Sequence, residues 1–216
     1  MAGYTRSNPS PRYQAMLAQY RQLHAEGDPN SQTPAEQMFD GRSLLPHIDR
    51  ISKYLRLHQC ASLLDYGCGK AKAYSDAVLR LPDGRQVNGL RQFWAPLDIR
   101  LYDPGQPAFD SYPSEAADGV ICSDVLEHVP EEDVPWVIDE LFRLSRRFVF
   151  ATIAFYPAKK TLPSGENAHV TLKPPAWWLD QLERASAAHG SRDYYATVYC
   201  PGPRRIDIAS APTPAA

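Results

Sequence analysis

The sequence predicts an α/β fold in which a mostly parallel sheet lies between layers of helices. From residue 61 onward, apolar runs typical of buried strands alternate with segments of helical apolar periodicity. The run 148–155 is almost continuously apolar, as expected of a central parallel strand covered on both faces. The run that ends at Asp65 passes directly into a loop with two glycines, which is typical of a strand turning into a helix beside a ligand.

The expected elements follow this alternation. We expect strands at 61–66, 97–102, 119–123, 148–155, 169–172 and 194–200, and helices at 72–80, 131–146 and 174–189. A polar and aromatic insertion, 85–96, precedes the second strand. The last two strands fit an antiparallel edge of the sheet. The tail 201–216 is rich in proline and alanine, and we expect it to be disordered.

Residues 1–60 are expected to form helices that flank or cover the main domain, which spans 61–200. The first helix begins after Ser10, with Pro11 at its first position, and ends at Gly27. A second helix begins near Ser43 and tolerates Pro46 in its first turn. The first helix carries one apolar stripe, formed by Tyr13, Met16, Leu17, Tyr20 and Leu23.

Composition excludes several classes of protein. The chain has 216 residues, enough for one domain, and a net charge of −2, which does not predict a nucleic-acid partner. It contains no apolar run of the ~20 residues that cross a membrane and no secretory leader, so we expect a soluble cytoplasmic protein. The four cysteines are scattered, so we expect neither a disulfide framework nor a metal site.

The most informative motif is 63–71, Leu-Leu-Asp-Tyr-Gly-Cys-Gly-Lys-Ala. Its acid, Asp65, precedes Gly67 and Gly69, whereas the dinucleotide fingerprint opens with glycine and places its acid about 20 residues later. The motif also lacks the Gly-Lys-Ser/Thr ending of a phosphate-binding loop. Cys68 lies within the loop and can line a ligand site. By itself the pattern is also compatible with an ordinary strand-turn-helix corner.

Acidic residues stand at the ends of three expected strands: Asp65, Asp103 and Asp124. In open α/β sheets, ligands bind outside the carboxyl ends of the strands. A carboxylate at Asp103 can accept hydrogen bonds from both hydroxyls of a ribose, although an Asp-Pro pair is also a common turn. The sequence therefore predicts a ligand site at this edge.

Two motifs together resemble those of class I S-adenosylmethionine-dependent methyltransferases. Asp65-x-Gly67-x-Gly69 resembles the first motif, with Ala71 where a third glycine often stands, and Asp124-Val-Leu-Glu-His128 resembles the fourth-motif region. The resemblance covers about 61–200. It implies a Rossmann-like three-layer sandwich with a seven-stranded, mostly parallel sheet and an antiparallel last strand. It also implies S-adenosyl-L-methionine as cofactor, bound by Asp65, Gly67, Cys68, Gly69, Asp103, Asp110, Ser123 and Asp124.

The resemblance places Glu127 and His128 near the mouth of an acceptor pocket. A histidine there can be the general base for an acceptor hydroxyl, or it can cap or pack against the following helix. The loop 156–169 follows the central strand and is the expected acceptor-specificity loop. It offers His169 as a second candidate base. Its Lys159 and Lys160 would meet an anionic acceptor, or they form a solvated turn.

Two functional hypotheses from different classes remain. The first is a methyltransferase that modifies oxygen or nitrogen of a small-molecule acceptor. The second is a catalytically silent cofactor-binding module that regulates or scaffolds a partner. A nicotinamide-dependent oxidoreductase is disfavoured because Gly-x-Gly-x-x-Gly is absent, and a DNA acceptor because 123–126 lacks an Asn/Asp-Pro-Pro-aromatic motif. The sequence assigns no acceptor and no oligomeric state.

Overall fold

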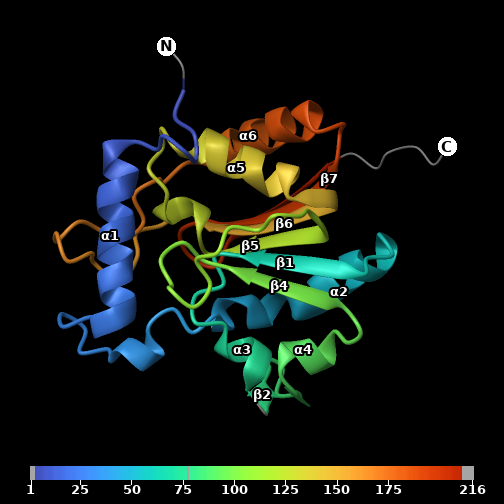
Figure 1. Cartoon of the computed structure of the whole chain (residues 1–216), viewed down its shortest axis with the longest axis horizontal. Helices are drawn as coiled ribbons and strands as arrows, with labels where there is room; N and C mark the ends of the chain where they lie inside the picture. The colour runs from blue at the N-terminus through green and yellow to red at the C-terminus, as the bar shows by residue number, and fades with distance from the viewer. Residues whose placement is uncertain (1–2, 77, 211–216) are drawn as a thin grey trace.

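The computed structural model describes residues 3–76 and 78–210 and has an α/β architecture, as predicted (Figure 1). In the described residues the main sheet has six strands, ordered β4-β1-β5-β6-β7-β8. The first five in this order are parallel and β8 is antiparallel to β7. The strands are β1 (Ser62–Tyr66), β4 (Asp98–Tyr102), β5 (Ala117–Ser123), β6 (Ser145–Ala154), β7 (Asp193–Tyr199) and β8 (Arg205–Ala209).

Helices cover both faces of this sheet (Figure 1). One face packs against α5 (Val134–Arg143) and α6 (Pro175–Ala188), and the other against α2 (Ile48–Leu57), α3 (Lys72–Ser75) and α4 (Leu90–Phe93). The alternation of side chains along a strand explains this division, because Leu63 enters one apolar core and Leu64 the other. Both side chains are fully buried. None of the helices in the described residues combines the length and apolar content that crossing a membrane requires.

The N-terminal helix α1 (Pro11–Glu26) lies across the carboxyl ends of the strands (Figure 1). Two short 3₁₀ helices, η1 (Ala35–Gln37) and η2 (Arg42–His47), connect it to α2. Met16 and Leu23 of α1 pack in a small core of their own with Met38, Leu162 and Ala168. This core joins α1 to the loop after β6, so the N-terminal segment covers the end of the sheet where a ligand is expected.

Ser10 links the start of α1 to Asp133, the residue before α5, through hydrogen bonds. Its hydroxyl accepts a hydrogen bond from the backbone N–H of Tyr13 at 3.0 Å and donates one to Asp133. Its backbone N–H also donates to Asp133, at 3.0 Å. Asp133 is fully buried, and the indole N–H of Trp136 supplies its other donor. One serine therefore acts as the helix cap and as a partner for a buried carboxylate.

We expect Ser10→Ala to lower the free energy of unfolding by about 2–3 kcal/mol, because it removes both the cap and a charge-assisted hydrogen bond. Chemical denaturation measures the change. Ser7→Ala is the matched control, because Ser7 is exposed and its hydroxyl forms a hydrogen bond with exposed Thr5. Equal stability of the two variants would contradict this account of Asp133.

Several predicted elements are wrong. In the residues that the structure describes, the main sheet has six strands, so the predicted count of seven is not confirmed, and 169–172 forms no strand. Tyr194–Cys200, expected as the antiparallel strand, corresponds to β7, which runs parallel to β6. The antiparallel strand is β8, inside the tail predicted to be disordered, where Ile206 and Ile208 pair with β7. Proline and alanine dominate the tail, and its short alternating run Arg-Ile-Asp-Ile-Ala forms a strand only because β7 offers an open edge. Residues 211–216 lie outside the described residues.

The expected helix 72–80 is also wrong in its length. It ends after one turn, at Ser75, and the chain continues into a separate two-stranded sheet of β2 (Leu79–Arg80) and β3 (Gln86–Val87). Gly89 lies close to the backbone of this segment, where an added Cβ would stand 2.8 Å from the carbonyl oxygens of Tyr74 and Asp76. Tight contact of the 85–96 insertion with the end of α3 therefore accompanies the early termination.

Candidate functional site

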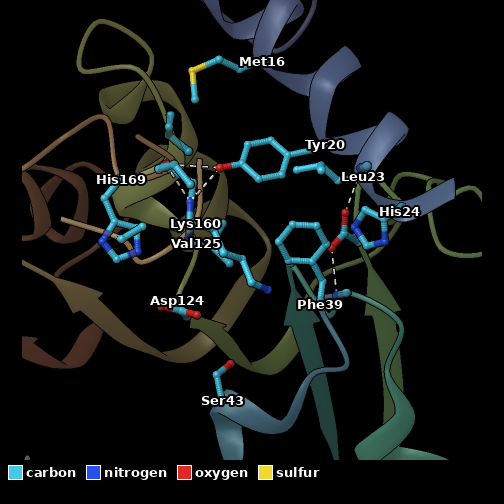
Figure 2. A pocket seen from close by; sticks show the side chains of 18 of the residues that line it. Met16, Tyr20, Leu23, His24, Phe39, Ser43, Asp124, Val125, Lys160 and His169 are labelled. Carbon is cyan, nitrogen blue, oxygen red and sulfur yellow. Dashed lines mark hydrogen bonds between the residues drawn. The ribbon is translucent and has the colours of Figure 1, made fainter. Parts of the chain in front are cut away.

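A cavity of about 480 Å³ lies between α1 and the carboxyl ends of β1, β4 and β5. This volume falls within the roughly 300–1,000 Å³ of small-molecule sites. Figure 2 shows Tyr20 and Phe39 entering from the α1 side, with Asp124 and His169 on the opposite wall. Of the residues predicted to bind ligands, the cavity wall contains Gly67, Gly69, Asp103, Ser123, Asp124, His128 and His169.

The glycine loop is held between two other segments of the chain. Gly67 has φ +86° and Gly69 has φ +58°. A Cβ added to Gly67 would stand 2.3 Å from Cγ2 of Val125, and one added to Gly69 would stand 2.1 Å from the carbonyl oxygen of Phe39. Both positions therefore require glycine for backbone conformation and for close approach. The second contact was not predicted, because Phe39 is distant in sequence.

Asp103 connects the glycine loop to the end of β4. Its Oδ2 accepts a hydrogen bond from the backbone N–H of Gly69 at 2.8 Å, and its Oδ1 accepts one from Gly105 at 2.8 Å. The carboxylate also lines the cavity. Because each carboxylate oxygen has a second acceptor position, Asp103 remains able to bind hydroxyl groups of a ligand.

Three predicted cofactor residues do not line the cavity. The carboxylate of Asp65 is buried beneath the loop and accepts a hydrogen bond from the Tyr74 hydroxyl at 2.8 Å. Burial raises the pKa of Asp65 from 3.8 to about 7, against the effect of that bond and with a smaller contribution from Asp103. Cys68 is buried in the core, and burial raises the pKa of its thiol. Asp110 is exposed outside the cavity.

The end of β5 directs Asp124 toward the cavity. The hydroxyl groups of Ser123 and of Thr152 on β6 share a hydrogen bond of 2.8 Å, in which either can be the donor. The backbone N–H of Asp124 donates to the carbonyl of Thr152 at 3.1 Å, and Asp124 has φ +61°. A non-glycine residue in this left-handed region is uncommon, and such residues concentrate at functional sites. Its exposed carboxylate forms part of the cavity wall (Figure 2).

Glu127 lies in the interior and not at the mouth of a pocket, which corrects the prediction. It is fully buried, and its Oε1 accepts a hydrogen bond from the N–H of Ala154 at 2.7 Å. Its backbone carbonyl accepts from Val170 and Thr171, so it anchors the chain after the 156–169 loop. Within the described residues its Oε2 has no partner. Burial, together with the nearby charge of Asp124, raises the pKa of Glu127 well above 4.5.

His128 and His169 stand side by side, with ring centroids 4.8 Å apart. Nδ1 of His128 lies 2.9 Å from the carbonyl oxygen of Ala168, and Nδ1 of His169 lies 2.6 Å from that of Tyr156. Because a carbonyl only accepts hydrogen bonds, we assign the ring proton of each histidine to Nδ1. The unprotonated Nε2 of each ring is then available to a ligand. Burial lowers the pKa of His128 below 6.5, which keeps this ring neutral at pH 7.

These groups converge in space. Asp124, His128 and His169 each offer one ligand atom, and the three atoms lie within 4.8 Å of one another. Two imidazoles and a carboxylate can coordinate a divalent metal ion, accept protons from a substrate, or bind a donor-rich ligand. The expectation of no metal site considered cysteines and overlooked this set, because the histidines are 41 positions apart (169 − 128).

Tyr20 and Phe39 also line the cavity, and neither was predicted as a site residue. Tyr20 of α1 donates its hydroxyl proton to the carbonyl of Ala168 at 3.2 Å, and its oxygen lies 2.7 Å from Nδ1 of His128. Nζ of Lys160 lies 5.1 Å from the centre of the Phe39 ring, within reach of a cation–π contact. Tyr20 belongs to the apolar stripe of the first helix, which could have indicated a covered surface but not which one.

Comparisons of this chain with protein-family models, with curated proteins and with solved structures found no match. The chemistry of the cavity therefore carries the functional argument. Three features define that chemistry: the glycine loop with Asp103, the carboxylate of Asp124 beside two histidines, and the lysines Lys159 and Lys160 in the loop after β6.

Proposed function

We propose that the protein is an S-adenosyl-L-methionine-dependent methyltransferase that modifies oxygen or nitrogen of a small acceptor. The observation that carries this proposal is the single cavity that joins the carboxyl ends of three neighbouring parallel strands. It contains Gly67 and Gly69 after β1, Asp103 after β4, and Asp124 after β5. Ligands of open α/β sheets bind at this edge.

The cavity suits a nucleoside with an amino-acid arm. Asp103 would accept hydrogen bonds from ribose hydroxyls, and the glycine loop beside it would allow the arm to approach the backbone. Ser123 and Asp124 would border the arm at the end of β5. Asp65 would act indirectly, through Tyr74 and the loop, because its carboxylate is not in the cavity wall.

The opposite wall is the expected acceptor side. Lys159, Lys160 and His169 come from the loop after β6 and line the same cavity. The two lysines favour an acceptor that carries negative charge. The bound cofactor would supply a methyl group on a sulfonium, which is a strong electrophile. The protein's main contribution would be to align the acceptor atom with that group and to exclude water beneath α1.

Calorimetric titration tests the proposal. We expect S-adenosylmethionine and S-adenosylhomocysteine to bind at micromolar concentration, and Asp103→Ala to weaken both by about 10- to 100-fold because a charged acceptor is lost. Asp110→Ala is the matched control, since this exposed carboxylate lies outside the cavity, and it should bind as the wild type does. Thermal unfolding of Asp103→Ala checks that the variant is folded.

The same titration separates the alternatives. Failure of both cofactors to bind at millimolar concentration would overturn the proposal, and binding of a nicotinamide cofactor instead would indicate an oxidoreductase. Binding without methyl transfer to any acceptor in a broad small-molecule screen would favour the silent cofactor-binding module. Methyl transfer that depends on Asp103 would establish the enzyme.

A further inference from the structure

We propose that Asp124, His128 and His169 form a binding site for one divalent transition-metal ion in the wall of the cavity. This goes beyond the methyltransferase proposal, which requires no metal. The three side chains come from the end of β5, from the 3₁₀ helix η3 (Leu126–His128) and from the end of the loop after β6. Figure 2 shows Asp124 and His169 on the same side of the cavity.

The distances are those of a site that needs little adjustment. The three ligand atoms lie within 4.8 Å of one another. An ion that binds nitrogen and oxygen at about 2.0–2.2 Å holds such atoms roughly 3–4 Å apart. Small rotations of the side chains would close the remaining gap. Asp124 is exposed, whereas the two histidines are held by hydrogen bonds.

Both histidines have the hydrogen-bond partners that metal-binding histidines commonly have. In metal sites, the ring nitrogen that does not bind the ion commonly donates its proton to a backbone carbonyl or a carboxylate, which selects the tautomer. His128 has the carbonyl of Ala168 at this position, and His169 has that of Tyr156. Tyr20 adds a further contact to Nδ1 of His128. Each ring therefore has an unprotonated Nε2. Hydrogen bonds within the protein set this tautomer, so no ligand is needed to do so.

The electrostatics of this wall favour a cation. Asp124 is held in a left-handed conformation at φ +61°, and its exposed carboxylate lines the cavity. Glu127 is fully buried, and in the described part of the chain its Oε2 has no hydrogen-bond partner. An unpartnered buried carboxyl oxygen is costly. An ion bound by Asp124 and His128 would place a positive charge near Glu127, which adjoins His128 in the chain.

The donor set indicates the class of ion. Imidazole nitrogens suit Zn²⁺, Co²⁺, Fe²⁺ and related ions, whereas Mg²⁺ and Ca²⁺ prefer oxygen ligands throughout. Two histidines and one carboxylate occupy three positions and leave others open toward the cavity. If the protein is a methyltransferase, an acceptor oxygen could occupy an open position, and the ion would lower the pKa of that hydroxyl. This consequence alone rests on the proposed function.

Metal titration without any cofactor tests the site. Purified protein is treated with a chelator, freed of any histidine tag, dialysed and titrated with Co²⁺ by visible absorption and with Zn²⁺ by calorimetry. We expect one ion per chain, and at least a 10-fold loss of affinity in His128→Ala, His169→Ala and Asp124→Asn. His189→Ala is the control, because this histidine pairs with Asp139 at 2.7 Å, remote from the cavity, and it should bind as the wild type does.

The outcomes are distinct from those of the cofactor test. No stoichiometric binding of Co²⁺ or Zn²⁺ by the wild-type protein would overturn the metal site, whatever the result with S-adenosylmethionine. Binding that survives Asp124→Asn and His169→Ala would overturn it as well. Asp124→Asn keeps the experiment decisive if a histidine variant unfolds, since Asp124 is exposed and its substitution preserves size. Metal binding without cofactor binding would leave the site established and refute only the methyltransferase.

Discussion

Gly69→Ala is expected to lower the free energy of unfolding by about 2–5 kcal/mol. At φ +58° the alanine costs about 1–2 kcal/mol in backbone conformation. Its Cβ would also stand 2.1 Å from the carbonyl oxygen of Phe39, and relief of such overpacking adds roughly 1–3 kcal/mol. Chemical denaturation measures the loss. Because the 39–41 segment must move away from the loop, binding of S-adenosylhomocysteine should weaken in parallel.

Gly84→Ala separates the two causes. Gly84 has φ +86°, and an added Cβ would meet nothing within 4 Å. This control should therefore show the conformational cost alone, about 1–2 kcal/mol, and leave ligand binding unchanged. If Gly69→Ala were no more destabilising than Gly84→Ala, the close contact between the glycine loop and Phe39 would be refuted.

Asp65→Asn is expected to remove a pH-dependent loss of stability. The folded protein holds this carboxyl at a pKa of about 7, mainly because it is buried, while the unfolded chain ionises it near 3.8. Between these values the unfolded chain releases the proton and the folded protein retains it. The free energy of unfolding of the wild type therefore falls as pH rises from about 4 to 7. The difference between the two pKa values corresponds to about 4 kcal/mol.

Denaturation of both proteins at pH 5, 6, 7 and 8 measures the effect. The advantage of Asp65→Asn over the wild type should grow with pH and level off above pH 7, because asparagine does not ionise and still accepts the hydrogen bond of Tyr74. Asp110→Asn should differ from the wild type by the same small amount at every pH, since Asp110 is exposed. A stability difference for Asp65→Asn that does not change with pH would contradict the buried, neutral carboxyl.

Local sequence was sufficient for the framework of the site. Near-continuous apolar runs predicted β1, β5 and β6, because parallel strands covered on both faces have no polar side to present. The glycines after β1 and the acids after β4 and β5 then fell at one edge by topology alone. Five of the predicted site residues line one cavity for this reason: Gly67, Gly69, Asp103, Ser123 and Asp124.

Packing between elements decided those parts of the fold and of the site that local sequence did not predict. Whether Asp65 faces the cavity or Tyr74 depends on how the glycine loop packs. The burial of Glu127 depends on β6 and on the segment that follows residue 169. β8 exists because β7 leaves an edge to pair with. In each case the outcome depends on packing against another part of the fold, which periodicity and spacing do not record.

The sequence by itself determined the α/β fold, the edge of the sheet at which the cavity lies and the glycine loop, since these depend on apolar pattern and on residues that adjoin in the chain. Only the tertiary structure placed α1 over that edge and brought Asp124, His128 and His169 within 4.8 Å of one another. Their convergence requires the loop after β6 to fold back onto the end of β5, where backbone carbonyls orient both imidazoles. Such an arrangement arises from packing and hydrogen bonding across the molecule, which a linear pattern does not encode.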